Sequence, residues 1–381
     1  MNSYAIVGCW GGNERADEHG IHTFRWNSEC ANFTYISSTL LNVRAGGMCW
    51  HPEKNILYIP NESAAAGMSS REGSACIYAV SVNEESGEIS EFCHVPAFGS
   101  NPAYVALDKS GRYLLSANHG SPQGVVKTCR GEDGSVQLQT IADESNVALF
   151  SVKEDGSLEG PLDIMVFEPK PGRRTSTHCA MLTPFGNHIA ICDIEDGCLY
   201  LMGIDEAKGQ LFVAGKYDGE EVNSARYCVF HPREKYIFIN NEHDKVVTAL
   251  AYDEEGNLSL ADSIEILPET HKGPVQQSGV RITPNGKYLY TLIRAINSVA
   301  AVKIKDGGKL EQIQLMAMDC VSPKDCAVTP DGKYLWVAGK VSGEMLLYGI
   351  NEDGTLNPEA KKTPLTNPAN IAFVIDGKPA R

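Results

Sequence analysis

Three consecutive stretches of the chain repeat one pattern, and this repetition limits the possible folds more than any other feature of the sequence. They cover residues 224–258, 276–310 and 323–356, and each holds three short apolar runs separated by turn residues. A fixed spacing between turn residues indicates repeated supersecondary units. Here a turn proline precedes a turn glycine by 24 residues in each stretch: Pro232 and Gly256, Pro284 and Gly308, Pro330 and Gly354.

Weaker copies of the same unit fill the rest of the chain. Copies begin near residues 46 and 101 and cover 177–211, and the copy from residue 101 carries an insertion at 126–146. Residues 4–33 lack the first strand of a unit, whereas the tail NPANIAFVID at 367–376 resembles a first strand such as NPAYVALD at 101–108. Joining the two ends of the chain completes a seventh unit.

The apolar runs predict β-strands throughout. Each run holds about five to seven residues rich in Val, Ile, Tyr and Phe, and turn residues bound it. Four antiparallel strands per unit, repeated radially, form a β-propeller. We therefore expect an all-β, seven-bladed β-propeller, a single domain over residues 1–381, whose ring is closed by pairing of the N- and C-terminal strands. A solenoid is the alternative, but the shared terminal unit favours closure.

Charge and composition narrow the classes of partner and cofactor. The net charge of −15 argues against nucleic acid and against an anionic membrane as partners. The first residues lack a signal-peptide pattern and no apolar run is long enough to span a bilayer, so we expect a cytoplasmic protein. None of the twelve cysteines forms a C-x-x-C pair. We therefore expect buried free thiols, no metal and no cofactor.

The repeat also predicts which polar residues meet. A residue just before the first strand and one just after the second strand lie at the same end of an antiparallel pair. In the stretch 224–258 these are Arg226 and Glu242. The same rule gives five more pairs: His178 with Asp193, Ser278 with Arg294, Lys324 with Lys340, Ala103 with Asn118, and Gly47 with Glu62.

These pairs predict a functional site where the innermost strands converge. His178 and Glu242 are candidates for acid–base work, and Arg226 and Arg294 for binding a carboxylate, a phosphate or an oxyanion. The alternative is that such residues only hydrogen-bond neighbouring blades. The expected catalytic set is His178, Glu242, Arg226 and Arg294, and the expected substrate-binding set is Lys340, Asp193, Asn118 and Glu62.

Four segments resemble the lactonase family of seven-bladed propellers, which includes bacterial 6-phosphogluconolactonases and fungal carboxy-cis,cis-muconate cyclases. They are NPAYVALDKSGRYLLSANHG from residue 101, THCAMLTPFGNHIAICDIEDGCLYLM from 177, SARYCVFHPREKYIFINNEHDKVVTAL from 224 and VRITPNGKYLYTLIRAINSVAAV from 280. The resemblance implies that His178, Arg226, Glu242 and Arg294 form the active site. The chain departs from the family at Tyr227, where His is usual, and at Lys340, where Gln is usual.

The resemblance implies hydrolysis of a sugar-derived anionic lactone, 6-phosphogluconolactone or a close relative, with Glu242 or His178 activating water. One alternative is a cycloisomerase that opens or closes a muconolactone without adding water. The other is a non-enzymatic propeller that serves as an interaction platform. The polar loop at 61–73 is interpreted as a surface turn or as a lid over the site. The oligomeric state is left open.

Overall fold

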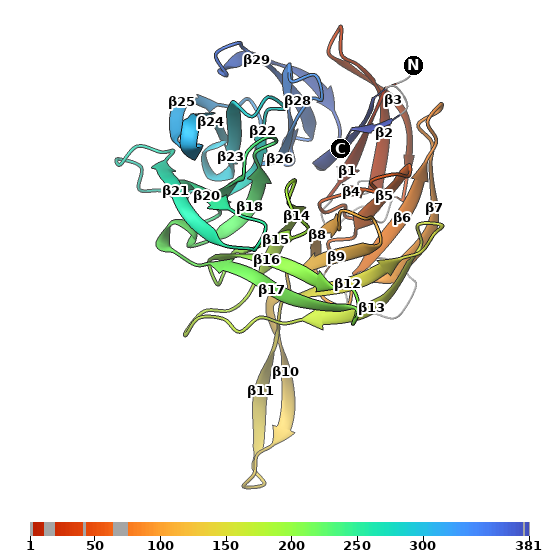
Figure 1. The fold of residues 1–381 in the computed structure, drawn as a ribbon, viewed down its shortest axis with the longest axis vertical. Helices are drawn as coiled ribbons and strands as arrows, with labels where there is room; N and C mark the ends of the chain where they lie inside the picture. The colour runs from red at the N-terminus through yellow and green to blue at the C-terminus, as the bar shows by residue number, and fades with distance from the viewer. Residues whose placement is uncertain (1–2, 11–19, 41–42, 64–74, 376–377, 381) are drawn as a thin grey trace.

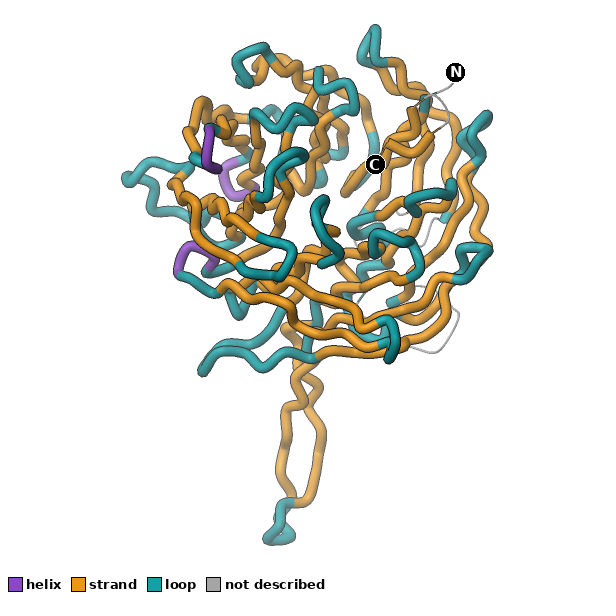
Figure 2. The backbone as a smooth tube through the Cα atoms, viewed as in Figure 1, coloured by secondary structure: helices purple, strands orange, loops and turns teal. Residues whose placement is uncertain are grey.

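The computed structural model describes residues 3–10, 20–40, 43–63, 75–375 and 378–380. They form seven antiparallel sheets arranged as the blades of a ring (Figure 1). Six blades have four strands and the seventh has five. The described residues also include three short 3₁₀-helices: η2 (Glu220–Val222), η3 (Arg294–Ile296) and η4 (Asp306–Gly308) (Figure 2). The expected all-β, seven-bladed propeller is confirmed.

The first three blades follow the chain in order. Blade 1 holds β4 (Cys49–Trp50), β5 (Ile56–Pro60), β6 (Cys76–Val82) and β7 (Ile89–Pro96). Blade 2 holds β8 (Pro102–Leu107), β9 (Tyr113–Asn118), β12 (Asn146–Val152) and β13 (Leu158–Met165). Blade 3 holds β14 (Thr177–Leu182), β15 (Ile189–Asp193), β16 (Cys198–Asp205) and β17 (Gln210–Tyr217).

The next three blades are the three clearest repeats of the sequence. Blade 4 holds β18 (Ala225–Phe230), β19 (Tyr236–Asn241), β20 (Val246–Tyr252) and β21 (Leu258–Glu265). Blade 5 holds β22 (Gln277–Ile282), β23 (Tyr288–Ile293), β24 (Ser298–Ile304) and β25 (Leu310–Ala317). Blade 6 holds β26 (Pro323–Val328), β27 (Tyr334–Gly339), β28 (Glu344–Ile350) and β29 (Leu356–Pro364).

Blade 7 is built from both ends of the chain. Its strands are β30 (Pro368–Ile375), β1 (Tyr4–Cys9), β2 (Gly20–Asn27) and β3 (Asn32–Thr39), with β31 (Lys378–Ala380) added beside β30. The strands β1 and β30 pair antiparallel, with Tyr4 opposite Val374 and Val7 opposite Ile371. The expected closure of the ring by its termini is therefore confirmed.

The turn glycines that mark the repeat are explained by the backbone conformation and packing of the turns. Gly256, Gly308 and Gly354 all adopt positive φ angles, which L-residues with a Cβ rarely tolerate. Gly286 lies in the turn between β22 and β23, and a Cβ there would come within 2.3 Å of His231 of blade 4. The His-Pro turn of one blade therefore packs directly against the glycine turn of the next.

The insertion forms a separate hairpin. It consists of β10 (Ser121–Arg130) and β11 (Val136–Asp143), and it projects beyond the ring (Figure 1). The expected boundary at 146 is a few residues late, because Asn146 begins β12 and pairs with Asn118 of β9. The hairpin lies outside the ring and does not cover its centre.

The core lies between the blades. Large side chains such as Phe238, Tyr290 and Trp336 are fully buried where adjacent sheets face each other. All twelve cysteines are free and eight of them are buried, as the sequence indicated, whereas Cys30 is exposed. Among the described residues, no helix is both long and apolar enough to cross a bilayer.

Candidate active site at the upper rim

A β-bulge recurs in the innermost strand of five consecutive blades. In β18 the register shifts between Ala225 and Tyr227, and equivalent shifts occur in β8, β14, β22 and β26. Bulges change the direction in which side chains point and are common next to active sites. The bulges lie where the first strands begin and the second strands end, an end of the ring that we call the upper rim.

The four residues expected to be catalytic form one network at the upper rim. The Nη2 atom of Arg226 donates to Nε2 of His178 over 3.2 Å. Glu242 pairs through Oε2 with Nε of Arg226 at 3.4 Å and through Oε1 with Nη2 of Arg294. The network therefore joins blade 3, blade 4 and the residue that follows β23 of blade 5.

Backbone contacts fix the two residues that follow the second strands. The N–H of Glu242 donates to the carbonyl of Ser224 over 2.8 Å, and the N–H of Arg294 donates to the carbonyl of Gln276 over 3.0 Å. These bonds continue the antiparallel ladder one residue beyond the strands. Both side chains are thereby held at the upper rim.

His178 is a neutral imidazole in this environment. Burial lowers the pKa of His178 well below its usual value, and the nearby charge of Arg226 acts in the same direction. Because Nε2 accepts a hydrogen bond from Arg226, the ring proton belongs on Nδ1. That Nδ1 atom is buried and has no hydrogen-bond partner.

Glu242 is held as a carboxylate. Burial raises the pKa of Glu242, but the charges of Arg226 and Arg294 outweigh burial, so the pKa lies below its usual value. Burial and the charge of Arg226 lower the pKa of Arg294 to about 10, and Arg294 still carries its charge at neutral pH. The side chain of Arg294 is 22% exposed and that of Arg226 only 7%. Arg294 is therefore the arginine that a ligand reaches first.

A second group of charges borders the site from blades 6, 7 and 1. Lys324 Nζ lies 3.3 Å from Oε2 of Glu62 and 4.1 Å from the centre of the Trp10 ring. Lys340 Nζ lies 3.5 Å from the centre of the same ring. Lys340 follows β27, and its N–H donates to the carbonyl of Ser322. We call Lys324, Lys340, Glu62 and Trp10 the lysine cluster.

Aromatic rings line the site beneath the network. The ring of Tyr227 lies 4.9 Å from that of His178 and 5.8 Å from that of Tyr104, measured between ring centres. Arg281 of blade 5 donates to the Tyr104 hydroxyl of blade 2 over 3.2 Å and pairs with Asp325 at 3.0 Å. These side chains bridge blades on opposite sides of the ring and form a floor below the upper rim.

Two residues expected to bind substrate have structural positions instead. Asn118 is fully buried, and its amide donates to the carbonyl of Ala97 and to Oδ1 of Asn146. Asp193 is fully buried as well, and its Oδ1 accepts the backbone N–H groups of Ser176 and Asp196. Both side chains hold loops at the upper rim, so we do not propose them as substrate contacts.

Lys324 and Trp10 of the lysine cluster were not among the residues expected at the site. Lys324 was recognisable as the rim partner of Lys340, because the spacing rule pairs them. Trp10 had no such signal, since it follows β1 in the blade shared by the two termini. The proposed lid at 61–73 falls mostly on residues 64–73, which lie outside the described residues.

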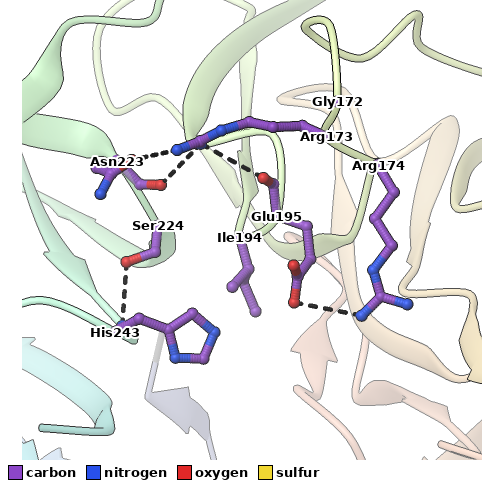
Figure 3. A pocket seen from close by; sticks show the side chains of 8 residues that line it. All are labelled: Gly172, Arg173, Arg174, Ile194, Glu195, Asn223, Ser224 and His243. Atoms are coloured by element: carbon purple, nitrogen blue, oxygen red, sulfur yellow. Dashed lines mark hydrogen bonds and ion pairs between the residues drawn. The ribbon is translucent and has the colours of Figure 1, made fainter. Parts of the chain in front are cut away.

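A cavity of about 500 Å³ lies beside the network, between blades 3 and 4 (Figure 3). His243 lines it and directly follows Glu242. Arg173 is tied to the structure, because its Nη1 donates to the carbonyls of Asp196 and Asn223. Arg174 is half exposed, and Glu195, at 3.3 Å, is its only ion-pair partner among the described residues. Arg174 is therefore the cation of this cavity that is available to a ligand.

One group of possible metal ligands occurs among the described residues. The sulfur atoms of Cys179, Cys192 and Cys228 lie within 4.8 Å of one another. All three side chains are fully buried, and they pack within the apolar core formed by blades 3 and 4.

Comparison with known proteins places this geometry in a family. Residues 7–373 match the model of the seven-bladed β-propeller lactonases. A 6-phosphogluconolactonase of Bacillus subtilis is 22% identical over 367 residues, which cover 94% of this chain and 96% of the relative. An uncharacterized protein of Lactococcus lactis subsp. cremoris is 26% identical over 337 residues, which cover 79% of this chain and 96% of the relative.

Solved structures show the same fold. A periplasmic gluconolactonase of Pseudomonas aeruginosa superimposes with a TM-score of 0.84 at 18% identity, covering 98% of this chain and 99% of that one. A putative 6-phosphogluconolactonase of Bacteroides uniformis gives a TM-score of 0.80 at 21% identity, with the same coverage. With the family match over nearly the whole chain, the protein belongs to the lactonase family of seven-bladed β-propellers.

Proposed function

We propose that this protein hydrolyses an anionic, sugar-derived lactone, and that 6-phosphogluconolactone is the first substrate to test. The observation that carries the proposal is the network of His178, Arg226, Glu242 and Arg294 at the upper rim. Such a network supplies fixed cationic donors that can stabilise the tetrahedral oxyanion of acyl transfer.

The charge balance at the rim favours an anionic substrate. The chain as a whole carries a net charge of −15. Cations nevertheless outnumber carboxylates around the site. The cations are Arg226, Arg281, Arg294 and Lys324, and the carboxylates are Glu62, Glu242 and Asp325. A local positive excess inside an acidic protein attracts an anion to this end of the ring.

The accessible groups suggest how the substrate lies. Arg294 is the more exposed arginine, so it would polarise the lactone carbonyl and stabilise the oxyanion. Arg226 would position His178 and Glu242, the two expected groups for activating water. The phosphate or carboxylate would occupy the cavity beside His243 and meet Arg174. Lys340 and Glu62 would contact the sugar ring from the opposite side.

The proposal is tested by a panel of freshly prepared lactones, each corrected for spontaneous hydrolysis. Wild-type protein and Arg294→Ala are compared, and the product mass is recorded. We expect a product heavier than the substrate by one water, and a loss of about 100-fold in kcat/KM for the variant. A product of unchanged mass would identify a cycloisomerase. Full activity of Arg294→Ala on every lactone that the wild type opens would contradict the proposed site.

A cytoplasmic location is part of the proposal. The gluconolactonase of Pseudomonas aeruginosa that shares the fold is a periplasmic protein, and that compartment is the alternative. Cell fractionation with compartment markers distinguishes the two.

A further inference from the structure

Two lysines at the upper rim share one indole ring but differ in their partners. Lys324 is nearly buried and pairs with Glu62 at 3.3 Å. Lys340 stacks on Trp10 at 3.5 Å, and no described carboxylate forms an ion pair with it. We propose that Lys340 carries the proton in this site: its amine takes a proton from the attacking water and returns it to the ring oxygen of the lactone. This inference rests on the proposed function.

The two groups first expected to activate water are already engaged. One oxygen of Glu242 pairs with Arg226 and the other with Arg294. A carboxylate held by two guanidinium groups is a weak base. The Nε2 lone pair of His178 accepts from Arg226, and its Nδ1 atom is buried. Neither group offers a basic lone pair to water in this arrangement.

The surroundings of Lys340 favour a neutral amine. Burial lowers the pKa of Lys340 to about 7, and the charge of Lys324 contributes. The charges of Arg294 and Arg44 act in the same direction, whereas Glu62 opposes them. Stacking on the Trp10 ring also opposes them, because an indole face favours the ammonium. Lys340 is partly exposed, as a group that exchanges a proton with water must be.

A base of this strength suits hydrolysis at neutral pH, because proton transfer is most effective when the pKa lies near the working pH. The amine of Lys340 accepts a proton as water adds to the carbonyl carbon, and the carbonyl oxygen becomes the oxyanion beside Arg294. When the intermediate collapses, the bond between the carbonyl carbon and the ring oxygen breaks. The ammonium then protonates that oxygen. The neutral amine is restored, and the hydroxy acid releases its carboxyl proton to solvent.

Competitive labelling tests the ionisation of Lys340 directly. The full-length protein is treated with acetic anhydride from about pH 5 to about pH 11, and the peptides that hold Lys340 and Lys333 are quantified by mass spectrometry. Lys333 lies in the exposed turn of the same blade and is the matched control. We expect half-maximal labelling of Lys340 near pH 7, at a clearly lower pH than that of the control. The same pH dependence of labelling for both lysines would overturn the inference.

Enzyme kinetics test the proposed role of Lys340 as the proton carrier. Wild-type kcat/KM should fall tenfold per pH unit below about pH 7. In Lys340→Gln this acidic limb should disappear, and the rate at neutral pH should fall by about 100-fold or more. Lys340→Arg keeps the positive charge but cannot supply a neutral amine, so it should be equally impaired, whereas Lys333→Gln should match the wild type.

The outcomes separate this inference from the proposed function. If Lys340→Gln keeps both the rate and the acidic limb on a lactone that the wild type hydrolyses, Lys340 is not the proton carrier and the proposed function stands. If the wild type opens no lactone of the panel, the proposed function fails and this inference fails with it. Loss of the acidic limb in Lys340→Gln, together with half-maximal labelling of Lys340 near pH 7, would support both the proposed function and this inference.

Discussion

The two charged groups at the upper rim are built in opposite ways. In the network of His178, Arg226, Glu242 and Arg294, each charged group has a charged or hydrogen-bonding partner. In the lysine cluster two lysine side chains lie on one indole ring, and the single carboxylate, Glu62, pairs with Lys324. Pairing fixes geometry and keeps each group in one charge state. Burial and an excess of like charge lower the pKa of Lys340 to about 7. The first group is suited to positioning and the second to proton exchange.

The largest effect should come from breaking the paired network at its centre. Arg226→Met removes the partner of both His178 and Glu242 and leaves a buried carboxylate short of one cation. We expect kcat/KM to fall about 1,000-fold and the free energy of unfolding to fall by about 3 kcal/mol. Lactone kinetics and urea unfolding measure the two effects. The control is Arg233→Met in the exposed turn of blade 4. An equal loss of kcat/KM and stability in that variant would show that Arg226 has no special role.

The paired network should also govern stability at low pH through His178. Its pKa is lowered in the folded state, so its contribution to stability is complete above the unfolded value of about 6.5 and is lost as the pH falls below it. The wild type should therefore lose stability from this group as the pH falls below about 6.5. His178→Gln should remove that part of the slope in urea unfolding, whereas the exposed His94→Gln should not. An unchanged slope in His178→Gln would show that His178 is not held neutral.

The lysine cluster should show the same direction of pH dependence in a more alkaline range. The pKa of Lys340 is lowered to about 7, so its charged form is destabilising below pH 7, and the wild type gains stability as the pH rises from about 7 to about 10.4. Lys340→Met should stabilise the protein at neutral pH by on the order of 1 kcal/mol after screening by solvent. Thermal unfolding at neutral and alkaline pH measures this, with the exposed Lys333→Met as control. Destabilisation by Lys340→Met would contradict the claim that the charged form of Lys340 is unfavourable in the folded protein.

The smallest effect should come from the cavity beside the network. Arg174→Ala removes an exposed ion pair with Glu195, so stability should change by less than about 1 kcal/mol. The KM of a phosphorylated lactone should rise about tenfold, with kcat and the KM of the unphosphorylated lactone unchanged. Arg25→Ala, an exposed residue of blade 7, is the control. Equal effects on both lactones would show that the phosphate lies elsewhere.

The sequence predicted the features that depend on the repeat. Blade number, closure and the pairing of Arg226 with Glu242 all follow from fixed spacing within or between units. Spacing could not predict how deeply each side chain is buried. Asn118 and Asp193 are the last residues of β9 and β15, one position before the place that Glu242 takes after β19, and both are buried loop supports. Spacing also could not place Trp10 beside Lys324, since only closure of the ring brings them together.

The most direct test of the paired network is the hydrolysis of freshly generated 6-phosphogluconolactone by wild type and Glu242→Gln, corrected for spontaneous opening. The substitution keeps the shape of the side chain and removes the charge that holds Arg226 and Arg294. We predict rapid turnover by the wild type and a loss of about 100-fold or more in the variant. Equal turnover by the two proteins would contradict the claim that this network forms the active site.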